Sequence, residues 1–191
     1  MRFIVPLLFL SFAVNAQHEL PSYQITPKGL INGVQPEQQY IVISYPGKPQ
    51  NELYKVFLVA ISKSYVSPKD VISKVEGESI SINALSNTTI HTKAKPGLPY
   101  KLTYVLNIAF KGERVRIDTP SIIQMVFNNP NHGNWYLDIS GKKKFLQDSP
   151  IYVFNEDGKL IEPEAKKEIE SALNEVVSGL LKEVNEQLKG W

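Results

Sequence analysis

The segment that decides the fold is Tyr100–Phe110, which has the sequence YKLTYVLNIAF. Aromatic or large aliphatic residues occupy every even position, whereas the odd positions are mostly polar or small. Successive side chains of a β-strand point to opposite faces, so this alternation predicts a long strand with one buried face. One packed face and one solvated face are common in antiparallel sheets. The segment therefore predicts an antiparallel sheet that is covered on one side.

The residues after this strand continue its pattern across a turn. A two-residue turn at Lys111-Gly112 places Ile108 opposite Val115 and keeps the apolar face apolar on both strands. The same register places Ala109 opposite Arg114 on the outer face. We therefore expect a hairpin with this register.

A first helix is predicted from about Pro49 to a point before Ser67-Pro68, because apolar residues recur there at helical spacing. The residues of this apolar face are Leu53, Val56, Phe57, Ala60 and Ile61. Phe57 and Phe110, together with Leu180 and Leu181 near the end of the chain, are bulky enough to fill a helix–sheet interface. This favours a closed core.

A second helix is predicted from Pro163 to a stop at Gly190, and it spans about 25 residues or nearly 40 Å. Glu162, Glu164 and Glu168 favour the positive end of its dipole. Its apolar stripe consists of Ile169, Leu173, Val176, Val177, Leu180, Leu181, Val184 and Leu188. A coiled-coil dimer is the alternative use of such a stripe, but the seam drifts off a heptad repeat. We therefore expect packing on the sheet of the same chain, and a monomer.

Shorter segments complete the predicted fold. Strands are predicted at 40–45, inside the sheet, at 71–75 and 80–84, as a hairpin, and at 135–139 and 151–154. The element order is then strand, helix, about four antiparallel strands and a long terminal helix. This is an α+β fold with two helices packed on one sheet face. Residues 40–191 form its single domain, and residues 17–39, which contain several Pro and Gly, form an extended lead-in.

The first residues predict export. Residues 1–16 combine Arg2, a short apolar run and the small residue Ala16, which is the pattern of a cleaved signal peptide. The apolar run is too short to span a bilayer, so no transmembrane anchor is expected. The chain has no Cys, which excludes disulfides and thiolate chemistry. Its 21 Lys and Arg nearly balance 19 Asp and Glu, which argues against nucleic-acid binding. The expected location is the periplasm or the extracellular space.

The hairpin motif Lys111-Gly112-Glu113-Arg114-Val115-Arg116, together with a long helix that closes on Gly190-Trp191, resembles the DUF4468 family. This is a family of uncharacterised secreted proteins from Bacteroidetes with a TBP-like fold. The resemblance covers roughly residues 40–119 and the terminal helix. It departs from the family pattern at Glu113, which is inserted, and at Val115, which replaces an aromatic residue. The resemblance implies a fold and a compartment but assigns no activity, and a TBP-like fold does not imply DNA binding.

Four residues are candidates for an interaction surface. Arg114 and Arg116 share the outer face of the hairpin, where they could meet an anionic ligand or simply form part of a solvated face. Trp135 and Tyr136 stand in a Gly/Asn-rich setting and suggest either an aromatic binding platform or an anchor for a loop. Lys142-Lys143-Lys144 suggests a solvated loop or a polyanion contact.

No catalytic, metal or cofactor site is predicted. The three histidines, His18, His91 and His132, lack neighbours at ligand spacing, and no nucleophile motif occurs. The acidic segment 155–158 is explained by a turn. The sequence therefore favours a non-enzymatic envelope or secreted protein that binds a partner protein, peptide or glycan. The alternative is a carrier of a small apolar ligand in a cavity between helix and sheet.

Overall fold

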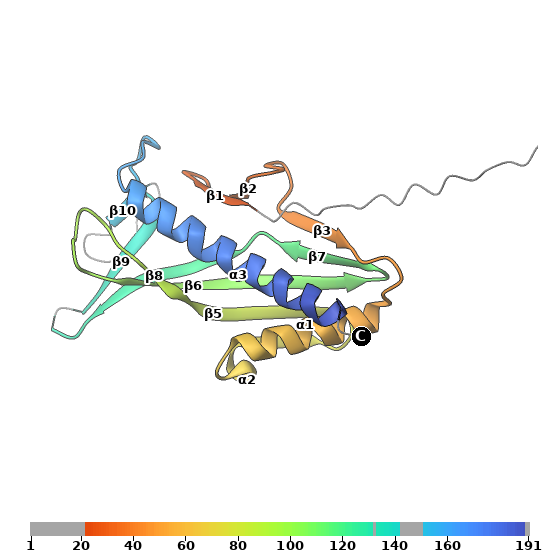
Figure 1. The fold of residues 1–191 in the computed structure, drawn as a ribbon. Helices are drawn as coiled ribbons and strands as arrows, with labels where there is room; N and C mark the ends of the chain where they lie inside the picture. Colours follow the sequence, from red (N-terminus) through yellow and green to blue (C-terminus); the bar gives the residue numbers. More distant parts are fainter. Residues whose placement is uncertain (1–21, 132, 142–150, 190–191) are drawn as a thin grey trace, which may run out of the picture.

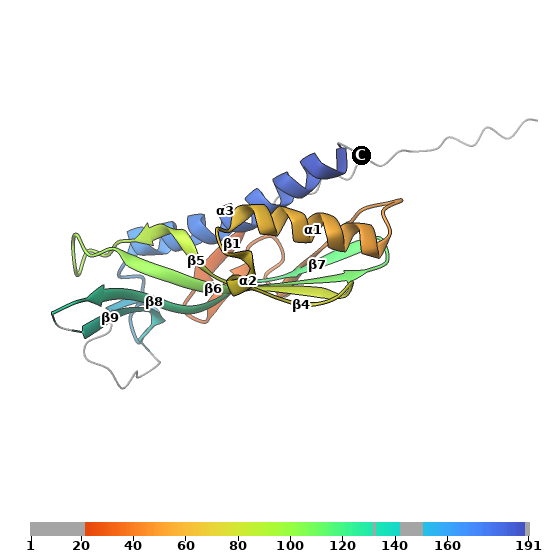
Figure 2. The ribbon, with the colours of Figure 1, turned by 90° about the horizontal axis from the view of Figure 1, so that it is seen from below.

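The structure, a computed structural model, describes residues 22–131, 133–141 and 151–189. An eight-stranded sheet carries two long helices, α1 (Gln50–Ser64) and α3 (Pro163–Lys189), on one of its faces (Figures 1 and 2). A two-stranded hairpin and the short helix α2 (Pro68–Val71) complete the described elements. The strands are β1 (Tyr23–Thr26), β2 (Gly29–Asn32), β3 (Tyr40–Ser44), β4 (Ile72–Val75), β5 (Ser79–Ile90), β6 (Tyr100–Lys111), β7 (Arg114–Asp118), β8 (Ser121–Asn129), β9 (Gly133–Ser140) and β10 (Ile151–Phe154). The predicted α+β class and the placement of both helices on one face are confirmed.

Strand β6 is the axis of the sheet. One edge of β6 pairs with β5, while its other edge pairs with β7 at 108–111 and with β8 at 101–105. All pairings in the large sheet are antiparallel except that of β10 with β9. The even positions of β6 are buried under the helices, as the alternation predicts. The sheet thus divides into a β3–β7 end and a β8–β9–β10 end, both built on β6.

The register of the β6–β7 hairpin differs from the predicted one. Phe110, not Ile108, lies opposite Val115, so the two-residue loop is Gly112-Glu113. A shift by two residues keeps every side chain on its predicted face, and alternation alone does not distinguish the two registers. Gly112 occupies the first loop position with a φ of +60°, the left-handed conformation that tight hairpin turns require.

Strand β3 lies at an edge of the sheet. Its composition predicts a position inside the sheet, and this prediction is wrong. Among the described strands it pairs with β7 alone. Ile43 is buried in the core, whereas Val42 points to the other face and is 47% exposed. The apolar residues on both faces of this strand therefore do not reflect burial on both faces.

The segment predicted as an extended lead-in contains the hairpin β1–β2, which is part of the core. Tyr23 and Ile25 are almost fully buried against α3. The Asn174 side chain of α3 accepts a hydrogen bond from the Tyr23 N–H at 2.7 Å and donates one to the Tyr23 carbonyl at 3.1 Å. Glu170 accepts the Ile25 N–H at 2.7 Å. Strands of four residues are too short to show a periodicity, so the sequence carries little signal for this hairpin.

Helix α3 confirms the predicted terminal helix, and the polar residues near its start bind a remote segment. The Glu162 carboxylate accepts the backbone N–H groups of Lys93 and Ala94 at 2.6 and 3.0 Å. Glu168 accepts the N–H of His91 at 2.6 Å. These carboxylates therefore hold the loop after β5, a role beyond the helix-dipole effect that the sequence predicts.

Aromatic contacts close the core between α1 and the sheet. The Phe57 ring lies 5.4 Å from that of Phe110, and Tyr54 lies 5.5 Å from Phe110, both edge to face. Leu180 and Leu181 of α3 are also buried. None of the described helices is long and apolar enough to cross a membrane.

Candidate functional site

The predicted arginines lie on β7 and point away from the helices. Arg114 and Arg116 are both exposed on this outer face. The Arg116 Nε donates a hydrogen bond to Asp118 at 2.7 Å, and its guanidinium lies 4.2 Å from the centre of the Tyr40 ring. Arg116 is thus oriented by two neighbours on the sheet surface.

Trp135 and Tyr136 are consecutive residues of β9, so their side chains point to opposite faces. The Trp135 ring lies 6.5 Å from that of Phe127, and the Lys95 ammonium lies 4.3 Å from its centre. Tyr136 instead lines a cavity of about 250 Å³ beside the β1–β2 turn. The two residues do not form a joint platform, and the surroundings of Trp135 match the anchoring interpretation.

The four candidate residues do not form one surface. Strands β7 and β8 pair with different parts of β6, and β9 lies beyond β8. Figure 1 shows β7 and β9 toward opposite ends of the molecule. The arginines and the aromatic pair therefore belong to separate regions.

A larger feature lies beside Arg116, on the outer face of β5 and β6. The central outward residues of these strands are short and uncharged, and we call them the open patch: Ser79, Ser81, Asn83, Val105, Asn107 and Ala109. They alternate with the buried residues under the helices, so they face the side of the sheet that Figure 2 shows free of α1 and α3. Ser81 donates a hydrogen bond to Asn107 at 2.8 Å. Arg116 borders the open patch, opposite Ala109.

The sequence contains a signal for the open patch, but strand periodicity alone does not reveal it. The odd positions of β6 between Lys101 and Lys111 carry no charge. A strand pattern alone does not say which outward positions of neighbouring strands meet, and pairing in space makes the six residues one surface.

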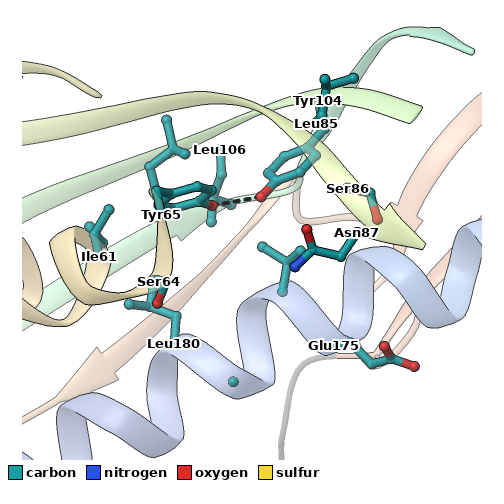
Figure 3. Close-up of a pocket in the computed structure, with 13 residues that line it drawn as sticks. Ile61, Ser64, Tyr65, Leu85, Ser86, Asn87, Tyr104, Leu106, Glu175 and Leu180 are labelled. Atoms are coloured by element: carbon teal, nitrogen blue, oxygen red, sulfur yellow. Dashed lines mark hydrogen bonds between the residues drawn. The ribbon is translucent and has the colours of Figure 1, made fainter. Parts of the chain in front are cut away.

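On the other side of the sheet, α1, α3, β5 and β6 enclose a cavity of about 190 Å³ (Figure 3). The hydroxyl oxygens of Tyr65 and Tyr104 lie 2.7 Å apart in its wall and share a hydrogen bond. Burial raises the pKa of both hydroxyls above the ordinary value of 10, so both are protonated at neutral pH. The cavity therefore presents neutral phenol groups beside aliphatic side chains.

Two backbone features shape the rim of this cavity. The β5–β6 register shifts between Leu85 and Thr89, a bulge that brings Ser86 and Asn87 into the lining. Gly179 lies on α3 at the cavity, and apart from its own turns of helix no described atom lies within 4 Å of a Cβ placed on it. The helix thus leaves free space at this point.

The remaining candidate groups show no catalytic arrangement in the described part of the chain. His91 Nδ1 lies 3.2 Å from a Glu168 carboxylate oxygen near the surface, and no cluster of three metal-binding side chains occurs within the described ranges. The acidic segment 155–158 forms the predicted turn, with the Gly158 N–H donating to the Asn155 carbonyl at 2.9 Å. Several features of the sequence lie outside the described residues: residues 1–16, His18, His132, Lys142-Lys143-Lys144 and Gly190-Trp191.

No family model matches this sequence, and no curated protein matches it. Two solved structures are similar to it. One is a TBP-like protein from Parabacteroides distasonis ATCC 8503, with a TM-score of 0.44 and 12% identity over 77% of this chain and 88% of that one. The other is a DUF4468 family protein from Bacteroides ovatus ATCC 8483, with a TM-score of 0.48 and 12% identity over 76% of this chain and 84% of that one. Their names are those of the family and fold that the sequence resembles, and neither name states an activity.

Proposed function

We propose that this protein is an exported, non-enzymatic protein of the cell envelope that binds a partner protein through the open patch. The observation that carries the proposal is the chemistry of this surface. Solvated sheet faces can carry any polar residue, but the open patch has no charge among six adjacent outward positions. The open patch shares two features with protein interfaces, in which charged residues are depleted at the centre and Arg is enriched.

The border of the open patch indicates the character of the partner. Arg114, Arg116 and Lys111 lie along one side, and of these Arg116 is paired with Asp118. A partner that places short polar residues over the patch and acidic residues against this border complements it in shape and charge. Neighbouring strands form a broad, shallow surface, which suits a protein better than a small glycan, since small ligands favour concave sites.

Export forms a separate part of the proposal. It rests on the pattern of residues 1–16, with cleavage after Ala16. N-terminal sequencing of protein recovered from the periplasm or the medium should start at Gln17. Material that starts at Met1, or that remains in the cytosol, would contradict it.

The binding proposal is tested with a matched pair of variants in the cells that make the protein. Asn107→Glu places a charge in the centre of the open patch, whereas Asn185→Glu places the same charge on an exposed position of α3. Native mass spectrometry of the recovered wild type and of Asn185→Glu should show a common complex with one protein. Asn107→Glu should lack that complex. Equal complexes in all three, or none in the wild type, would contradict the proposal.

The alternative, a carrier of a small apolar ligand, has a matching feature in the cavity between the helices and the sheet. Its volume of about 190 Å³ lies below the roughly 300–1,000 Å³ of typical ligand sites. A long-chain lipid therefore does not fit, and only a molecule of about one ring remains in this class.

A further inference from the structure

We infer that the cavity formed by Tyr65, Tyr104, Asn87, Glu175 and Gly179 is a binding site for a neutral organic molecule of single-ring size that carries a carbonyl or hydroxyl group. This site lies between the helices and the sheet, whereas the open patch lies on the opposite face of β5 and β6, so the site does not depend on the proposed partner.

The size of the ligand follows from the volume of the cavity. An apolar cavity of about 150 Å³ in a protein core accommodates one benzene molecule. The cavity here has about 190 Å³ and opens to solvent beside exposed residues of α3, so a ring with one small substituent fits. Ile61, Ile82 and Leu106 supply the aliphatic wall that such a ring contacts.

The polar group of the ligand follows from the tyrosine pair. Two hydroxyl groups carry two protons, and only one proton lies between the oxygens of Tyr65 and Tyr104. No acceptor for the second proton is found among the described residues. An acceptor oxygen on the ligand would satisfy this proton beside the aliphatic wall of the cavity, where an unmade hydrogen bond is costly.

The charge of the ligand follows from the lining. Glu175 is the one charged side chain among the described residues that line the cavity. It is exposed and accepts a hydrogen bond from Ser171 at 2.7 Å. No cationic side chain is among the described lining residues, so the Glu175 carboxylate disfavours the binding of an anion. The same carboxylate can accept hydrogen bonds from N–H or O–H groups of a neutral ligand.

Gly179 gives an independent reason to assign binding here. A glycine within an exposed helix position lowers helix stability relative to alanine, and no neighbour at this position requires the small residue. Gly179 is one of the residues that line the cavity, so a larger side chain there would occupy open space at its rim. A glycine at this position thus leaves the rim of the cavity open.

The test uses benzamide and benzoate, which have the same size but differ in charge. Chemical shifts of the full chain are followed by NMR during titration with each compound. Benzamide should bind with a dissociation constant of about 1 mM or below and shift the amides of Ser86 and Gly179. Benzoate should bind at least about tenfold more weakly, and Glu175→Gln should narrow this difference.

Two further variants connect the binding to the cavity. Gly179→Leu fills it and should weaken benzamide binding at least about tenfold, whereas Lys182→Leu, on an exposed part of the same helix, should leave binding unchanged. Replacement of both Tyr65 and Tyr104 by Phe should weaken it about fivefold, with an unchanged melting temperature. The inference is overturned if the wild type binds no benzamide, if Gly179→Leu binds it as the wild type does, or if benzoate binds equally well.

Discussion

The two faces of β6 differ in the kind of residue that they carry. Its even positions, such as Leu106 and Ile108, are large, apolar and buried under α1 and α3. Its odd positions between Lys101 and Lys111, such as Asn107 and Ala109, are short and uncharged and are exposed or half-exposed. Burial of apolar area explains the first set, because it stabilises the fold. It does not explain the second set, so this open face is where we expect selection for binding rather than for folding.

The covered face should be the most sensitive part of the molecule. Leu173→Asp places a carboxylate in the fully buried stripe of α3 and removes an apolar side chain. The loss should be at least about 3–5 kcal/mol out of a total stability of about 5–15 kcal/mol, so the protein should unfold or aggregate. Thermal melting followed by circular dichroism measures this, with Lys182→Asp on the exposed side as the control, expected within about 0.5 kcal/mol of the wild type.

The same variant distinguishes the fold from the coiled-coil alternative. If Leu173→Asp keeps its melting temperature but converts a dimer into a monomer, the stripe is a contact between two chains. The comparison of covered and open faces would then be wrong.

Loss of the Glu162 hydrogen bonds before α3 should give the next largest effect on stability. Glu162→Ala leaves the N–H groups of Lys93 and Ala94 without their buried acceptor. We expect the free energy of unfolding, measured in urea, to fall by about 2–3 kcal/mol. Glu164→Ala, on an exposed position of the same turn, is the matched control. If both variants lower the free energy of unfolding equally, Glu162 acts only through the helix dipole and not through its hydrogen bonds.

High pH should lower the free energy of unfolding through ionisation of Tyr45. Burial raises the pKa of Tyr45 to about 12, above its ordinary value of 10. Between these two pKa values the folded state retains a proton that the unfolded state loses. The contribution of Tyr45 to the free energy of unfolding is therefore complete below pH 10 and is lost as the pH rises toward 12. Urea unfolding at pH 8 and pH 11 should show a loss of stability that is smaller in Tyr45→Phe. An identical loss in this variant would contradict the assignment to Tyr45.

The elements that the sequence predicts best are those whose own period identifies them. Residues 100–110 show an alternation that no other structure explains, and the stripe that starts at Ile169 identifies α3 equally well. The predicted hairpin register is off by two residues. Alternation determines the face on which a side chain lies, but it does not distinguish registers that differ by an even number of residues. Tyr23 and Ile25 are missed because their strand has four residues and is stabilised by side chains of α3.

The site was harder to predict because it depends on contacts between distant segments. Arg114 and Arg116 were placed on the correct face, but the open patch beside them is assembled from two strands whose register was not known. The Tyr65–Tyr104 pair joins residues from different elements, and neither residue has a distinguishing sequence context.

The open face should be the least sensitive to substitution in stability. Asn107→Glu removes one exposed hydrogen bond, from Ser81, and no buried contact. We expect its free energy of unfolding to stay within about 0.5 kcal/mol of the wild type. A loss above about 2 kcal/mol would mean that this face contributes to the fold, and the contrast with the covered face would then disappear.

The central claim is that the open face, and not the helix side, contacts a partner. The most direct measurement is photo-crosslinking in intact cells, with a photoreactive amino acid placed at Asn107 in one variant and at Asn185 in another. Both positions are exposed, but Asn107 lies in the open patch and Asn185 lies on α3. We predict one discrete adduct from the probe at Asn107 and none from the probe at Asn185. An adduct from Asn185 alone, or from neither position, would contradict the account.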